Sequence, residues 1–72
     1  MNIRQNALVK FDFSMIHDMD YHEYPFGPED RFVYIGDIVQ MPGHCIVVRM
    51  SDGQNFAGYH TDDFIELTEE EV

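Results

Sequence analysis

The chain has 72 residues, which is enough for one small domain with a compact core. Fourteen acidic residues against four lysines and arginines give a formal net charge of −10 at pH 7. Such a surface repels the phosphates of nucleic acids and of anionic membranes, so direct binding to either is not expected. The single cysteine excludes an intrachain disulfide, and no apolar run reaches the length of a signal peptide or a membrane span. A cytoplasmic location is therefore predicted.

The first half of the chain predicts one strand followed by a long loop. Residues 7–13 predict a β-strand, because they are rich in strand-forming residues and the apolar Val9, Phe11 and Phe13 alternate with Lys10 and Asp12. Residues 14–30 contain two prolines, a glycine and many acids, so they predict a long acidic loop. Within this loop, aromatic anchors are expected at Tyr21, Tyr24 and Phe26.

The second half predicts four more strands with turns between them. Asp52 and Gly53 favour a type I′ hairpin turn, and residues 68–72 predict a solvated acidic tail. Residues 32–35 form an apolar strand that could pair at an edge, so a monomer or a weak homodimer is expected. The predicted elements are strands over 31–41, 44–50, 55–59 and 64–68, and one 3₁₀ turn over 60–63.

Three segments together resemble the SH3 domain family across nearly the whole chain. They are Ala7-Leu8-Val9-Lys10-Phe11, Gly36-Asp37-Ile38-Val39 and Gly58-Tyr59-His60-Thr61-Asp62-Asp63-Phe64-Ile65-Glu66. The resemblance implies an all-β fold, a five-stranded SH3-like barrel forming a single domain over residues 1–72, with 14–30 as its long acidic RT-type loop.

The positions of the family's proline-binding groove are altered in this chain. Val9 and Phe64 stand where the family has tyrosines, Thr61 stands at the proline, and the tryptophan position falls near His44 and Cys45. Polyproline helices dock on aromatic side chains with hydrogen-bonding tips. Because those tips are missing, ordinary PxxP recognition is not expected.

Charge is segregated along the chain, and this segregation carries the functional prediction. Twelve of the 14 acids lie within 12–30 and 62–71. In an SH3-like topology these segments flank one groove, so they would form one acidic face that attracts basic partners. The predicted function is a non-enzymatic interaction module that docks a basic protein surface. The binding residues expected on that face are Asp18, Asp20, Tyr21, Glu23, Tyr24, Phe26, Asp62 and Asp63.

Two other interpretations of the charge remain open. The acidic face could imitate nucleic acid, as in small phage-type inhibitors that block nucleic-acid-binding enzymes. Alternatively, the acids could serve only to keep a small protein soluble. A nucleic-acid mimic would be displaced competitively by DNA or RNA, which separates the first interpretation from simple protein docking.

Catalytic and metal chemistry is weakly indicated. His17, His22 and His60 are the only metal candidates, and their spacing with the neighbouring carboxylates matches no standard zinc motif. Cys45 is expected to be a buried thiol, as a free cysteine in a strand usually is. It cannot form a dyad with His44, because adjacent strand residues point to opposite faces. No catalytic residue, metal or cofactor is therefore predicted, and the chain is not expected to be an enzyme.

Overall fold

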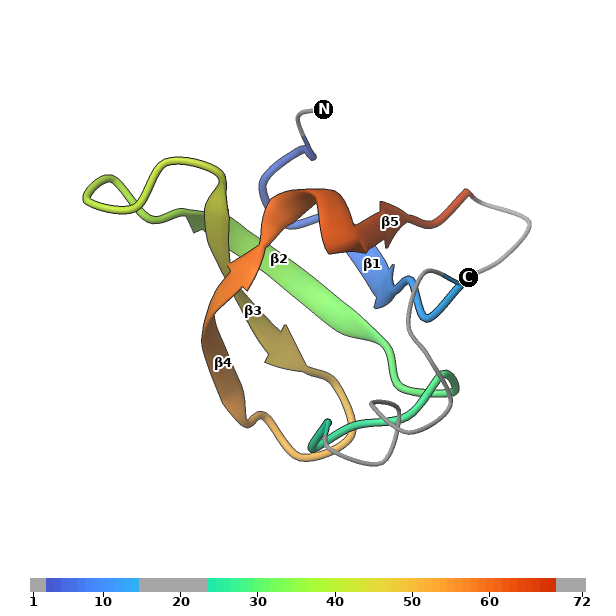
Figure 1. Cartoon of the computed structure of the whole chain (residues 1–72). Helices are drawn as coiled ribbons and strands as arrows, with labels where there is room; N and C mark the ends of the chain where they lie inside the picture. The colour runs from blue at the N-terminus through green and yellow to red at the C-terminus, as the bar shows by residue number, and fades with distance from the viewer. Residues whose placement is uncertain (1–2, 15–23, 69–72) are drawn as a thin grey trace.

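A computed structural model of the chain describes residues 3–14 and 24–68. Within them, five antiparallel strands form one sheet in the order β4-β3-β2-β1-β5 (Figure 1). A single 3₁₀ turn, η1, joins β4 to β5. The elements are β1 (Leu8–Phe11), β2 (Phe32–Asp37), β3 (His44–Arg49), β4 (Asn55–His60), η1 (Thr61–Asp63) and β5 (Phe64–Glu66).

The all-β prediction is confirmed, with strands shorter than the sequence indicates at most of their ends. The sheet is not closed into a barrel, because in the described residues its two edge strands, β4 and β5, are not paired with each other. The η1 turn instead carries the chain from β4 across to β1, on which β5 pairs through Phe11 and Phe64. None of the described residues forms a helix long and apolar enough to cross a bilayer.

Two irregularities set the registers of the central strands. Between β3 and β4, Cys45 pairs with Tyr59 but Ile46 pairs with Ala57, so Gly58 is an extra residue in β4. Gly58 has a φ of +90°, a conformation that residues with a side chain rarely adopt. A similar shift in β2 leaves Ile35 unpaired, and 37% of its surface is exposed.

Two predictions about the strands and turns are wrong. Strand β2, which contains residues 32–35, lies between β1 and β3, so it offers no free edge for a homodimer. The hairpin between β3 and β4 is not a type I′ turn, since Gly53 has a positive φ (+73°) and Asp52 does not. The hairpin is a longer loop, in which the Gly53 N–H donates to the Arg49 carbonyl at 2.8 Å.

An aromatic core lies against one face of the sheet. Val9 and Phe11 of β1 are buried, as the alternation along this segment predicts. Phe26 enters the core from the segment before β2 and packs against rings from three different strands. The buried core residues are Val9, Phe11, Phe26, Phe32, Tyr34, Cys45, Val47, Phe56 and Phe64.

Arg49 holds the segment containing Phe26 against the hairpin. Its Nη1 donates to the Pro25 carbonyl at 3.0 Å and lies 3.8 Å from the Asp30 carboxylate. Its Nη2 donates to Asp52 at 2.7 Å, and its guanidinium lies 5.2 Å from the centre of the Phe56 ring. One side chain thus joins three segments, and its stem shields an edge of the core.

The Arg49–Asp52 contact predicts an acid-sensitive part of the stability. The Arg49 guanidinium, helped by the Gln54 backbone N–H, lowers the pKa of the Asp52 carboxyl from 3.8 to about 2. A carboxyl with a depressed folded-state pKa stabilises the fold above its unfolded pKa and loses that contribution as pH falls through the folded value.

We therefore expect the free energy of unfolding to fall between about pH 4 and pH 2, and this part of the fall to be absent in Asp52→Asn. A side-chain NMR titration of Asp52 should have its midpoint near pH 2. A midpoint near 3.8, the ordinary value, would contradict the contact.

Candidate functional site

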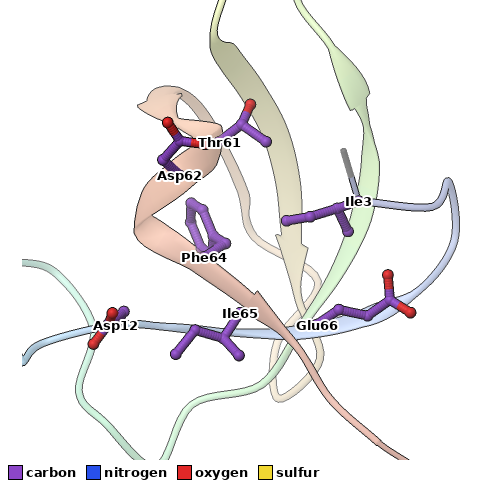
Figure 2. A pocket seen from close by; sticks show the side chains of 7 residues that line it. All are labelled: Ile3, Asp12, Thr61, Asp62, Phe64, Ile65 and Glu66. Carbon is purple, nitrogen blue, oxygen red and sulfur yellow. The ribbon is translucent and has the colours of Figure 1, made fainter. Parts of the chain in front are cut away.

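A pocket of about 390 Å³ opens where η1 and β5 pass over the chain near β1 (Figure 2). Its apolar surface comes from Ile3, Phe64 and Ile65, and carboxylates stand at its border. The residues that line it are Ile3, Asp12, Thr61, Asp62, Phe64, Ile65 and Glu66.

Backbone pairing brings these distant residues together. The Asp12 N–H donates to the Asp63 carbonyl at 2.7 Å, which fixes the end of β1 against η1. Along β5, side chains alternate between the two faces of the strand. Phe64 is therefore buried at 3% exposure, whereas Ile65 is 39% exposed and faces outward at the pocket.

Two of the bordering carboxylates are held in the ionised form. The Arg4 guanidinium donates to Glu66 at 2.6 Å, and this contact lowers the pKa of the Glu66 carboxyl. The Ser14 hydroxyl and its backbone N–H, the latter at 2.9 Å, lower the pKa of the Asp12 carboxyl. Both carboxylates are therefore ionised at neutral pH, and Arg4 balances the charge of Glu66.

The predicted binding residues are distributed unevenly over the molecule. Asp62 is exposed at the pocket, and the neighbouring Asp63 is half-buried. Tyr24 is half-buried, with its ring 5.0 Å from that of Phe11 and 5.8 Å from that of Phe13. The other predicted residues lie outside the described part of the chain: Asp18, Asp20, Tyr21 and Glu23, together with the metal candidates His17 and His22.

Phe26, which the sequence places among the binding residues, lies in the core of the structure. Its side chain is only 6% exposed, and its ring lies 5.1 Å from those of Phe11 and Phe32. An aromatic residue in a proline-containing loop is compatible with either a core or an interface position. In the structure, the Phe26 ring packs against rings of β1, β2 and β4, which is a core position.

The apolar part of the pocket was not predicted from the sequence. Ile3 lies before the first strand, where no pattern indicates a contact. Ile65 lies in β5, where an apolar residue usually indicates packing within the sheet. The signal that could have revealed it is the strand alternation, because Ile65 lies on the opposite face from Phe64 and faces outward if Phe64 is a core residue.

The positions that the SH3 resemblance assigns to a polyproline groove are covered here. Val9 is fully buried, and Phe11, Thr61 and Phe64 are at most 8% exposed. A ligand could reach these side chains only slightly. Thr61 and Phe64 do line the pocket, but its more exposed lining residues are Asp62 and Ile65.

The buried polar groups beside the pocket do not form a reactive thiol site. Cys45 is fully buried, and burial raises the pKa of its thiol. The nearby Tyr34 hydroxyl donates to Asp37, and burial together with this bond raises the pKa of Tyr34 to about 12. A thiolate nucleophile needs the opposite, a lowered pKa and access to solvent.

His60 lies beside a histidine of the neighbouring strand. Its ring lies 4.2 Å, between centroids, from that of His44 on the neighbouring strand. Across residues 3–14 and 24–68, no group of three or more His, Cys, Asp and Glu side chains is arranged to hold a metal ion.

Comparison with protein-family models, with curated proteins and with solved structures gives no match for this chain.

Proposed function

We propose that the protein is a non-enzymatic interaction module whose acidic face docks a basic protein surface. The face is centred on the pocket bordered by Asp12, Asp62 and Glu66, and it includes Asp63 beside them. Asp18, Asp20 and Glu23, which lie outside the described residues, are included in the same proposed face by their place in the sequence.

The observation that carries the proposal is the combination of apolar surface and carboxylates in one pocket. Lysine and arginine have apolar stems and charged ends, so they bury the stem on apolar surface and place the charge beside a carboxylate. Ile3 and Ile65 would contact the stem, while Asp62 and Asp12 would face the charge. A purely apolar ligand would leave the carboxylates desolvated, which costs free energy.

We further propose an SH3-like architecture for this module. The strand order and the 3₁₀ turn between the last two strands support that assignment. A shared architecture would not transfer a function, because functions reside in sites rather than in folds. The buried groove positions argue against proline-rich ligands, and the acidic pocket argues for basic ones.

A second candidate function is a nucleic-acid-mimicking inhibitor. The net charge of −10 on a 72-residue chain favours it, since a dense array of negative charge resembles a phosphate backbone. Under that function, the basic partner would be the nucleic-acid-binding surface of an enzyme, and the same acidic face would be used.

The two candidates are separated by capturing partners from a lysate at low and high salt and identifying them by mass spectrometry. For the docking module, we expect a protein that DNA does not displace and that high salt releases. Partners that DNA displaces competitively would instead support the mimic. Capture that is unchanged by salt would contradict both, because each depends on charge.

A further inference from the structure

Two histidines face each other where β3 begins and β4 ends. His44 and His60 are paired across the strands, with ring centroids 4.2 Å apart and ring planes inclined by 38°. The Thr61 N–H donates to the Gly43 carbonyl at 2.8 Å, directly beyond this pair. That bond identifies His44 and His60 as a non-hydrogen-bonded pair, the type in which opposite side chains approach most closely.

The bulge at Gly58 creates this juxtaposition. Ile46 pairs with Ala57, and continuing that register without an extra residue would place His44 opposite Tyr59. Gly58 shifts the register by one, so His44 instead meets His60. The positive φ of this glycine, +90°, makes the shift a fixed feature of the strand.

One of the two imidazoles is oriented in the way that metal-binding histidines usually are. His44 Nδ1 lies 3.1 Å from the Pro42 carbonyl oxygen. A carbonyl oxygen only accepts hydrogen bonds, so Nδ1 is the donor and the Nε2 of neutral His44 keeps its lone pair. A backbone carbonyl on the second nitrogen fixes the tautomer and the ring orientation of many metal ligands.

We propose that His44 and His60 together bind one divalent transition-metal ion of the zinc class, with water as the remaining ligands. Zinc–nitrogen bonds of about 2.0–2.1 Å would place the two ring centroids roughly 4.5–5.2 Å apart for N–metal–N angles of about 90–110°. The observed separation therefore needs to widen by about 1 Å or less. His60 is exposed, so its ring has room to turn relative to His44, whose ring is held by the Pro42 carbonyl.

The charge around the pair favours a cation. Asp62 and Asp63 lie two and three residues after His60 along the chain, and the protein as a whole carries a net charge of −10. Such a field raises the local concentration of cations. The site is independent of the proposed docking pocket, because neither histidine lines that pocket.

The test is a calorimetric titration of the full chain with ZnCl₂ at neutral pH. Three variants are compared with the wild type: His44→Gln, His60→Gln, and a control in which His17 and His22 are both replaced by glutamine. Each single variant should lose affinity on the order of tenfold or more, since removing one of two ligands removes about half of the protein's coordination. The control should keep its affinity within about twofold.

A second measurement, the melting temperature with and without zinc, shows whether each variant is folded and whether it binds zinc. Zinc should raise the melting temperature of the wild type and of the control, because it binds only the folded pair, and should raise that of neither single variant. NMR should show zinc-induced shifts of the His44 and His60 imidazole protons. Loss of binding in the control alone, or absence of zinc binding in the wild type, would overturn the proposal.

Discussion

Replacing Phe26 by alanine is expected to lower the free energy of unfolding by about 3–5 kcal/mol, the usual cost of removing a buried phenylalanine. The ring is 6% exposed and lies 5.1 Å from Phe32, 5.3 Å from Phe56 and 5.5 Å from Tyr59. Removing it would leave a cavity between rings from several strands. Urea denaturation followed by circular dichroism measures the loss, with an unchanged slope indicating an unchanged unfolded state.

Tyr24→Ala is the matched control for this prediction. Tyr24 belongs to the same aromatic group but is half-buried, so its loss should cost clearly less, about 1–2 kcal/mol. If Phe26→Ala instead kept the stability within about 0.5 kcal/mol and weakened partner binding, Phe26 would be an interface anchor after all. That result would contradict the core position described here.

The second large effect is expected at Asp62. Changing Asp62 to lysine places a positive charge at the border of the pocket, where the proposed partner's lysine or arginine would sit. Like charges at such a contact cost several kilocalories per mole, so we expect the affinity for the basic partner to fall on the order of 100-fold at low salt. The loss should shrink as salt is added, since screening weakens both the original attraction and the new repulsion.

Glu29→Lys provides the control for charge alone. Glu29 is exposed, like Asp62, and its reversal changes the net charge by the same two units, but it does not line the pocket. We expect it to reduce the affinity only about threefold, through the long-range field. Equal losses for the two variants would contradict a localised site, and no loss for Asp62→Lys would exclude the pocket as the docking surface.

Much of the fold could be predicted because local patterns coincide with the packing. The alternation of Val9 and Phe11 with Lys10 and Asp12 places β1 correctly. Gly53 marks the hairpin between β3 and β4, and Gly58 marks the bend in β4. The prediction of a closed barrel is not met, because closure depends on how far β4 and β5 extend beside each other. The turns decide where each of these strands ends, and residue types alone do not predict those ends to within one or two residues.

The candidate site was harder to predict for a related reason. Asp62 and Asp63 could be predicted because the clustering of acidic residues is apparent in the linear sequence. Ile3 and Ile65 were missed because their meeting depends on the pairing of β1 with β5. His44 and His60 are brought opposite each other by the one-residue bulge at Gly58. A glycine within a strand indicates a bend, but it does not specify the pairing register that results.

The central claim is that basic side chains dock in the pocket bordered by Asp12, Asp62 and Glu66. The most direct measurement is an NMR titration of isotope-labelled protein with a short lysine- and arginine-rich peptide. The account predicts that the largest shifts occur at the backbone amides of these residues and of Ile65, and that they diminish as salt is added. Shifts confined to the hairpin of residues 50–54, or no shifts at low salt, would contradict it.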